Sequence, residues 1–494
     1  MNRNAAVELL RANLAGDRGE RIAYIDRNGS HSYRSLADRS RQFAHLLNAA
    51  GIAPGERVLL ALEDTVAFPI CFLGALQAGV VAVPLNTMLT AGDFAFIAED
   101  SGAVAVVASA GLIDRMPAGL AQFGVDSDAD GWRDLDAALS GQPATPIQPV
   151  SGGADIAFWL YTSGTTGKPK GVIHTHANML ATAERYGQGV LDLSDRDLVF
   201  SASKLFFAYG LGNSLTFPLA AGATVVLLDT TSRPDAVHAI LNEHRPTVFF
   251  GVPTLYARLL NTGNVPRDHR IRLCISAGEA LPEAILRRWQ EATGIEILDG
   301  IGSTEMLHMY ISNRAGDVRP GTSGTPVDGY RVKILDESGN EVPDGNMGDL
   351  YVAGPSLTTG YWNRPELNRE TFDGPWMHSG DKFVRNESGA YAYCGRSDDL
   401  LKVGGIYVSP MEVENALLEH EAVAEAAVVG QADDDHLIKP KAFVVAKTTK
   451  IDEQTLIDHV AARLAAYKRP RWVEFVDQLP KTATGKIQRF KLRQ

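Results

Sequence analysis

Cysteine is scarce in this chain, with only Cys71, Cys274 and Cys394 among 494 residues. They lie far apart without Cys-X-X-Cys spacing, so the sequence offers neither a disulfide framework nor a cysteine zinc site. Basic side chains are also in deficit, because 59 acidic residues against 47 basic ones leave a formal net charge of −12. Such a protein has no overall attraction to nucleic acid or to an anionic membrane. We expect a cytoplasmic protein with neither partner.

The segment 66–85 needs to be considered as a membrane span, because its 20 positions carry no charge and could cross a membrane by length alone. Pro69 and Gly79 interrupt it, so we interpret it as a buried helix, a break at Gly79 and a buried strand over 80–83. Residues 1–10 contain charges and no apolar run, and we expect no signal peptide there.

Segments typical of strands and helices alternate along most of the chain. For example, residues 247–250 are rich in β-formers, and Pro253 can open a helix directly after them. This alternation predicts α/β layers with buried, mainly parallel strands. A chain of 494 residues also exceeds one ordinary core. We therefore expect a large, multi-layer N-terminal domain over residues 1–397.

The pattern of strand-like and helix-like segments changes near residue 398. We expect residues 398–494 to form a small, mobile α+β domain. Ser409, Pro410 and Glu412 have the spacing of a capping box with proline at the first helical position. Residues 463–494 contain nine Lys or Arg against two acidic residues. This basic stretch is either a solvated tail or part of a lid that meets phosphates.

A loop rich in small residues follows the apolar run 156–160. It reads Tyr161-Thr-Ser-Gly-Thr-Thr-Gly-Lys-Pro-Lys-Gly171. Small residues allow the backbone to approach a ligand, and the hydroxyls and amides can donate to phosphate oxygens. It is not a Walker A loop, because only two residues separate Gly164 from Gly167 and Pro169 occupies the Ser/Thr position. His174 and His176 follow with metal-ligand spacing, but no cysteine or carboxylate adjoins them, so we assign no metal there.

The loop resembles the phosphate-binding signature of the adenylate-forming superfamily, which includes acyl- and aryl-CoA synthetases. Further segments match that family in the family's order, so the resemblance covers essentially the whole chain. These segments are Ser276-Ala-Gly-Glu-Ala280, Asp299-Gly-Ile-Gly-Ser-Thr-Glu305, Ser379-Gly-Asp381, Gly395-Arg-Ser-Asp-Asp399 and Pro480-Lys-Thr-Ala-Thr-Gly-Lys486.

The resemblance implies that the chain uses ATP, Mg²⁺ and coenzyme A to activate a carboxylic acid as an acyl-adenylate and form a thioester. Two anions meet when a carboxylate attacks the α-phosphorus, so the site must neutralise charge. By resemblance, Glu305 is the magnesium ligand, Thr304 contacts the α-phosphate, and Lys486 is the catalytic cation. A hard carboxylate oxygen suits magnesium.

The same resemblance assigns the remaining nucleotide and CoA contacts. The β- and γ-phosphates would meet Thr162, Ser163, Gly164, Thr165, Thr166, Gly167 and Lys170. The adenosine would meet Ala277, Gly278, Glu279, Asp299, Gly300, Ile301, Asp381 and Arg396. Asp398 would be the hinge, and Gly404 and Gly405 would line the channel for the pantetheine arm.

Residues 204–213, 249–256 and 305–308 resemble benzoate-CoA ligases in particular. Carried over, the pocket for a small aromatic acid is lined by Phe207, Ala208, Tyr209, His308 and Met309. Aromatic walls with one polar tip suit a flat ring that carries one carboxylate. Because methionine is adaptable, substituted benzoates or a non-aromatic ring acid remain open.

Three other functions compete with an aryl-CoA ligase. A pantetheinyl carrier protein could replace CoA as acceptor, although no carrier domain follows Lys486. A luciferase-like oxygenase would use the same adenylate. A non-catalytic nucleotide-binding relative is disfavoured because Glu305 and Lys486 are both present. The ring substituents, the pathway and a homodimeric state are left open.

Overall fold

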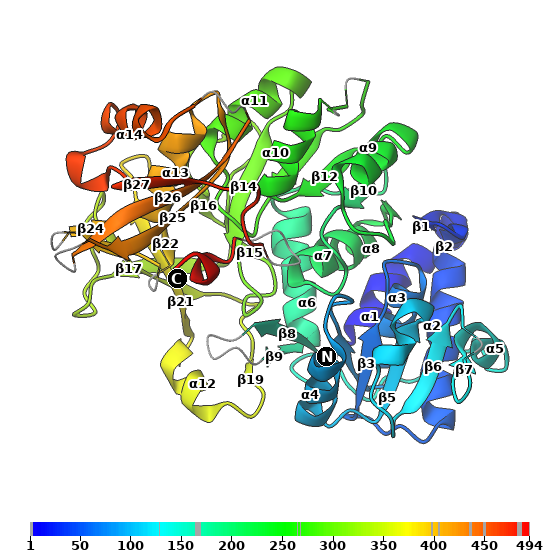
Figure 1. The fold of residues 1–494 in the computed structure, drawn as a ribbon. Coiled ribbons are helices and arrows are strands. Elements are labelled where there is room, and N and C mark those ends of the chain that lie inside the picture. The colour runs from blue at the N-terminus through cyan, green and yellow to red at the C-terminus, as the bar shows by residue number, and fades with distance from the viewer. Residues whose placement is uncertain are drawn as a thin grey trace.

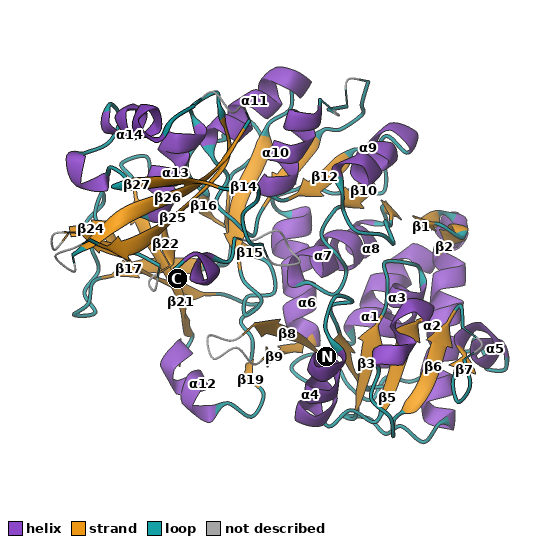
Figure 2. Ribbon diagram, viewed as in Figure 1, coloured by secondary structure: helices purple, strands orange, loops and turns teal. Residues whose placement is uncertain are grey.

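The computed structural model describes residues 3–127, 129–163, 169–263, 265–266, 268–396, 399–403, 406–433, 437–447, 451–481 and 487–493. A large N-terminal part carries mixed helices and strands, and the orange and red C-terminal part lies on one side of it (Figure 1). Figure 2 shows that helices border the strands throughout. The chain is thus an α/β protein, as the sequence predicted.

The first sheet has a parallel centre and antiparallel edges. Its order is β16 (Thr325–Pro326), β15 (Met309–Ser312), β14 (Ile297–Gly302), β13 (Leu273–Ser276), β12 (Val248–Gly251), β10 (Leu198–Ser201), β11 (Thr224–Val226), β1 (Ile22–Asp26) and β2 (Gly29–Ser32). Strands β14 to β1 in this order are parallel to their neighbours, whereas β15, β16 and β2 are antiparallel. The central strands β12 and β13 are wholly buried, which explains their apolar runs.

The second sheet is built in the same way. Its order is β19 (Gly360–Tyr361), β9 (Pro169–Thr175), β8 (Ile156–Ser163), β4 (Val81–Pro84), β3 (Arg57–Ala61), β5 (Ala105–Ser109), β6 (Ala121–Val125) and β7 (Arg133–Asp134). Strands β8 to β7 are parallel, and β9 and β19 are antiparallel. Strands β8 and β9 form a hairpin around the small-residue loop.

Helices fill the space between these sheets and cover their outer faces. One apolar core joins alternate residues of both sheets, such as Leu60 and Val199, with the helices between them, whereas Leu59 faces a second core on the other side. The helices of this region are α1 (Ala5–Arg11), α2 (Tyr33–Ala49), α3 (Ala67–Gln77), α4 (Ala91–Ser101), α5 (Leu135–Ser140), α6 (His176–Thr182), α7 (Ala208–Leu211), α8 (Phe217–Ala221), α9 (Pro234–Glu243), α10 (Pro253–Thr262) and α11 (Glu283–Thr293). Two π-helical segments, η4 (Ala183–Gln188) and η5 (Gly212–Thr216), extend α6 and α7. Short 3₁₀ turns are η1 (Ala12–Leu14), η2 (Gly16–Glu20) and η3 (Ala110–Arg115).

The uncharged segment 66–85 is confirmed as a buried helix followed by a buried strand. It forms α3 and β4, and Gly79 separates them with a φ of 73°. Within the described ranges, no helix is both long and apolar enough to cross a membrane.

An antiparallel sheet, which the sequence pattern did not predict, follows the first two. It contains β17 (Arg331–Leu335), β18 (Met347–Ala353), β21 (Trp376–Arg385), β20 (Phe372–Asp373) and β22 (Tyr391–Arg396), with α12 (Pro365–Thr371) beside it. It positions Asp381 and Arg396 opposite each other on β21 and β22.

The C-terminal part has its own apolar core. Its elements are β23 (Leu401–Val403), β24 (Ile406–Val408), α13 (Pro410–Leu418), β25 (Val423–Ala432), β26 (Ile438–Ala446), α14 (Glu453–Ala461), η6 (Ala466–Lys468), β27 (Trp472–Phe475) and η7 (Arg489–Leu492). The expected capping box was wrong in one respect. Helix α13 does begin at Pro410, but the Ser409 side chain makes no capping hydrogen bond, and both carboxylate oxygens of Glu412 accept from Lys468 instead.

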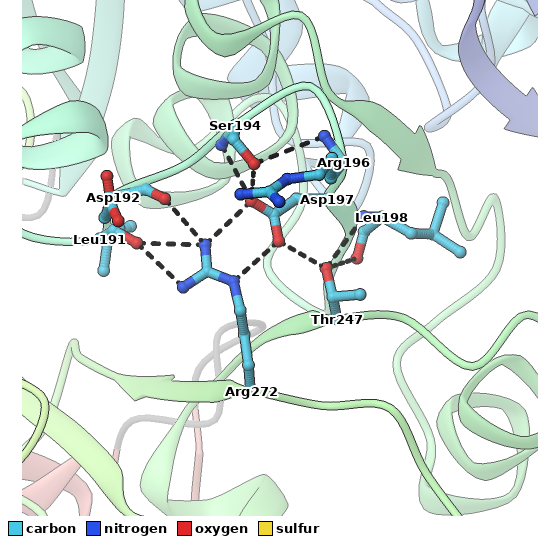
Figure 3. A network of polar contacts seen from close by, with 8 residues as sticks. All are labelled: Leu191, Asp192, Ser194, Arg196, Asp197, Leu198, Thr247 and Arg272. Carbon is cyan, nitrogen blue, oxygen red and sulfur yellow. Dashed lines mark hydrogen bonds and ion pairs between the residues drawn. The ribbon is translucent and has the colours of Figure 1, made fainter.

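A polar network ties together the N-terminal ends of three strands of the first sheet (Figure 3). The Arg272 guanidinium before β13 donates to both oxygens of Asp197 at 2.8 and 2.9 Å and to the carbonyl of Leu191. Thr247 before β12 donates to Asp197 and accepts from the amide of Leu198 at the start of β10. Because these strands are parallel, their C-terminal ends meet at the opposite edge, where ligands bind in such sheets.

Candidate active site

The segments that follow the central strands gather at this C-terminal edge. Ala277 and Gly278 follow β13 directly. Gly278 has a φ of 91°, a backbone conformation that residues with a side chain rarely adopt. Glu279 accepts a hydrogen bond of 2.9 Å from the Thr254 hydroxyl on α10. The predicted adenosine segment 276–280 is therefore in direct contact with the segment 249–256, which resembles that of benzoate-CoA ligases.

Strand β14 carries three further predicted nucleotide residues. Asp299 is buried, and burial raises the pKa of its carboxyl well above the ordinary value. Its backbone carbonyl accepts from Asn313 at 3.0 Å. Gly300 leaves room for Met309, because a Cβ at Gly300 would lie 2.7 Å from its sulfur. Ile301, the next residue, pairs with β15.

Glu305, the predicted magnesium ligand, lies in a partly buried cluster with one cation and one phenol. Lys170 Nζ is 3.4 Å from Oε1 of Glu305, and the hydroxyl of Tyr361 donates to the same oxygen at 2.8 Å. Burial opposes ionisation of Glu305, but the charge of Lys170 and the Tyr361 hydroxyl outweigh it and lower the pKa of the carboxyl. An ionised hard carboxylate of this kind fits Mg²⁺, which takes one or two protein carboxylates together with substrate phosphates.

Thr304, which precedes this carboxylate, is held by a buried histidine. Nε2 of His174 donates to the carbonyl oxygen of Thr304 at 2.8 Å. Burial lowers the pKa of His174 to about 4, so the ring is neutral at physiological pH. Among the described residues, no group of three or more His, Cys, Asp or Glu could hold a metal. Through its hydrogen bond to Thr304, His174 acts as a structural donor.

Asp381 and Arg396 face each other across β21 and β22. Nη1 of Arg396 is 3.5 Å from Oδ1 of Asp381 and 3.3 Å from the carbonyl oxygen of Ser379. Gly380, which precedes Asp381, has a φ of 74°, a backbone conformation that favours glycine. The structure therefore brings two of the predicted adenosine residues together.

His308, one of the predicted aryl residues, is surrounded by aromatic rings. Nε2 of His308 donates to Oδ1 of Asn213 on η5 at 3.1 Å, and the Asn213 amide donates to the hydroxyl of Ser201. The ring packs against Tyr186, Tyr209 and Phe217, with centroids 5.0, 5.5 and 4.5 Å away. Burial lowers the pKa of His308 to about 3, so the imidazole stays neutral.

The other aryl residues lie at the start of α7 and in β15. The Tyr209 hydroxyl lies 3.3 and 3.4 Å from the carbonyl oxygens of Gly251 and Ile275, which are the last residue of β12 and the last but one of β13. Phe207 and Ala208 are half-buried against the central core. Met309 is buried over Gly300. The aryl segment thus adjoins the adenosine segments at the same sheet edge.

The phosphate loop is described only at its base. Thr162 and Lys170 are register partners across the β8–β9 hairpin. The predictions for Gly164, Thr165, Thr166, Gly167, Asp398, Gly404, Gly405 and Lys486 fall outside the described residues, as does the side chain of Ser163. Tyr361 was missed by the sequence reasoning, and His174 was considered only as a metal ligand. Asn213 lay within a matched segment but was given no role.

Comparisons with known proteins agree with this geometry. Residues 11–362 match the family of AMP-binding enzymes, and residues 412–486 match the AMP-binding enzyme C-terminal domain. The chain is 51% identical to a benzoate–CoA ligase of Thauera aromatica, over 99% of this chain and 95% of that protein. It is 44% identical to a 4-hydroxybenzoate–CoA/benzoate–CoA ligase of Rhodopseudomonas palustris, over 99% and 94%.

Solved structures give the same result. A benzoate CoA ligase from Burkholderia xenovorans superposes with a TM-score of 0.93 at 49% identity, covering 100% of both chains. An anthranilate CoA ligase in complex with anthranoyl-AMP superposes with a TM-score of 0.94 at 39% identity, covering 99% of this chain and 96% of the other. The protein therefore belongs to the family of AMP-binding enzymes.

Proposed function

We propose that this chain is an ATP-dependent ligase that converts benzoate, or a benzoate with one small ring substituent, to its CoA thioester. The observation that carries the proposal is the full-length likeness to a benzoate–CoA ligase, which spans both matched family regions. The aromatic surroundings of His308 support the same substrate class. The reaction has two halves, with benzoyl-AMP as the intermediate.

In the first half, a carboxylate oxygen of benzoate attacks the α-phosphorus of ATP and pyrophosphate leaves. The approaching groups are both anionic, so preorganised cations lower the barrier. We propose that Glu305 holds Mg²⁺, which when bound supplies charge neutralisation on the phosphates. Lys170 would contact the β- and γ-phosphates, and Thr304 the α-phosphate. The proximity of Lys170 to Glu305 supports these assignments.

In the second half, the CoA thiolate attacks the acyl carbon and AMP leaves. We propose that residues 398–494 rotate about Asp398 between the two halves. This motion would withdraw Lys486 from the site and bring Gly404 and Gly405 to the pantetheine arm. Glycine at both positions suits a narrow channel, because it leaves room for a thin thiol chain.

The neutral pocket also orients the acid. His308 carries no charge at physiological pH, and its neighbours are aromatic, so an anionic carboxylate buried there would lack a partner. The ring should enter the pocket while the carboxylate faces Lys486 and the α-phosphate of the nucleotide. Burying a phenyl ring of about 100 Å² contributes about 2.5 kcal/mol, or close to a hundredfold in kcat/KM.

A panel of acids tests the proposal. Benzoate, 4-hydroxybenzoate, 2-aminobenzoate, cyclohexanecarboxylate, acetate and a long-chain fatty acid would be compared by acid-dependent pyrophosphate release and CoA-dependent AMP release. A pantetheinylated carrier protein would be tried in place of CoA. Benzoate or a singly substituted benzoate should give the highest kcat/KM with CoA. If acetate or a fatty acid is best, the aryl assignment is wrong, and if only the carrier protein accepts the acyl group, the CoA assignment is wrong.

A further inference from the structure

The segment 358–362 is fastened to β9, the strand that follows the phosphate loop. The Thr358 hydroxyl donates to the carbonyl oxygen of Ile173 at 2.5 Å, and the Trp362 amide donates to that of Gly171 at 2.9 Å. The Thr358 amide also donates to the backbone carbonyl of Glu305 at 2.8 Å. One short segment therefore contacts both the phosphate-loop strand and the predicted metal ligand.

The backbone of Tyr361, within this segment, makes hydrogen bonds in addition to those of strand pairing. Oδ1 of Asn368 accepts from the Tyr361 amide at 2.7 Å, and its Nδ2 donates to the Tyr361 carbonyl at 3.0 Å. The next residue, Trp362, donates from its indole to the carbonyl of Asp100 at 2.9 Å. The Arg364 guanidinium donates to the Asp100 carboxylate. The backbone that carries the phenol is thus fixed on both sides.

The buried side chain of Tyr361 makes two functional contacts at once. Its hydroxyl donates to Oε1 of Glu305 at 2.8 Å. Its ring faces Lys170, whose Nζ lies 3.8 Å from the ring centroid and 3.4 Å from the same Oε1. A cation at this distance from an aromatic face is attracted to it, and more strongly when both are partly desolvated.

We infer that Tyr361 is a positioning residue, whose hydroxyl fixes the Glu305 carboxylate for a divalent cation and whose ring places the Lys170 ammonium beside it. Without this contact, the carboxylate on the flexible Glu305 side chain would sample several orientations. The free-energy cost of ordering it would then weaken metal binding. Tyr361 acts through its neighbours and need not touch the substrate. The inference rests on the proposed function for its reaction, but its metal-binding consequence can be measured without turnover.

Two substitutions separate the contacts. Tyr361→Phe removes the hydroxyl and keeps the ring, whereas Tyr361→Leu removes both. Tyr33→Phe is a matched control, because its buried hydroxyl donates to the carbonyl of Ala223 at 2.7 Å on another part of the fold. Thermal unfolding of the unliganded proteins would report any loss of stability common to the two Tyr→Phe changes.

The primary readout is the affinity of Mn²⁺ for the complex with α,β-methylene-ATP, followed by water-proton relaxation. Tyr361→Phe should weaken Mn²⁺ roughly tenfold, as expected for a lost hydrogen bond to a charged group. It should leave the nucleotide affinity without metal within about twofold. Tyr361→Leu should in addition weaken that affinity a few-fold, through loss of the cation–π contact. Thioester formation from supplied benzoyl-AMP should change less than twofold in all variants.

Wild-type Mn²⁺ affinity in Tyr361→Phe would overturn the inference. So would a loss no larger than that of Tyr33→Phe, since this would mark a purely structural effect. Failure of the proposed function would give a different result. The wild type would then release no pyrophosphate with any aryl acid, while the Mn²⁺ affinities of the wild type and the variants would keep the same order.

Discussion

Gly212, the first residue of the π-helical segment η5, has no room for a side chain. A Cβ at this position would lie 2.5 Å from Cδ2 of His308 and 2.9 Å from Cζ of Phe217. Carbon atoms in contact stay about 3.5–4.0 Å apart, so Gly212→Ala must displace at least one of the rings. The substitution therefore probes the packing of the aryl pocket with a single methyl group.

The rings cannot yield freely. Nε2 of His308 is hydrogen-bonded to Asn213, and its ring packs against Phe217 with centroids 4.5 Å apart. Overpacking of a filled core costs about 1–3 kcal/mol. If this cost falls on the complex with the acid, kcat/KM for benzoate should fall roughly 5- to 150-fold, since 1.4 kcal/mol corresponds to tenfold.

Steady-state kinetics would check this result, with kcat/KM for benzoate measured beside KM for ATP. The expected outcome is a selective loss for benzoate, with the KM for ATP within about threefold of wild type. Gly111→Ala is the matched control, because a Cβ there meets none of the described atoms within 4 Å. Unchanged benzoate kinetics in Gly212→Ala, or an equal loss for benzoate and ATP, would refute the pocket assignment.

Three further predictions follow from the same site. Lys486→Ala should slow pyrophosphate release by about 10²–10³-fold or more, while thioester formation from supplied benzoyl-AMP is spared, and equal damage to both steps would exclude its role. Asp398→Pro, which fixes φ near −65°, should impair the thioester step more than the adenylate step in single-turnover assays; an unaltered ratio would argue against the hinge. His174, His176 and His308 have pKa values lowered by burial to about 4, 4 and 3, so below pH 6.5 the unfolded chain binds protons that the folded chain does not. Stability should therefore fall as pH drops from about 6.5 towards 4, by up to ~4 kcal/mol per pH unit near pH 5, and a flat free energy of unfolding in urea between pH 7 and 5 would contradict this.

Features with a local physical cause were predictable from the sequence. The uncharged run 66–85 gives α3 and β4 because both elements are buried on all sides, and Gly79 supplies the left-handed turn between them. The adenosine segments were recognised through their resemblance to family motifs, and the structure shows that Gly278 and Gly380 within them have a positive φ. Such constraints act on neighbouring residues and so leave a pattern in the chain.

Features that depend on distant partners were not predictable. Tyr361 meets Glu305 across 56 residues of chain, and no spacing rule connects them. Glu412 had the position for a capping box, but Lys468, also 56 residues away, binds it instead. The antiparallel sheet was missed although β18 does alternate between buried and half-buried residues over its first six positions. Only the fold decides which of several plausible partners a side chain meets.

Isotope transfer from labelled benzoate tests the central claim most directly. Benzoate carrying ¹⁸O in both carboxylate oxygens would be incubated with the protein, ATP, Mg²⁺ and CoA, and the released AMP would be analysed by mass spectrometry. Attack of the carboxylate on the α-phosphorus predicts one ¹⁸O atom in each AMP, with one benzoyl-CoA formed per AMP. AMP without ¹⁸O, or ADP and phosphate as products, would contradict an acyl-adenylate intermediate.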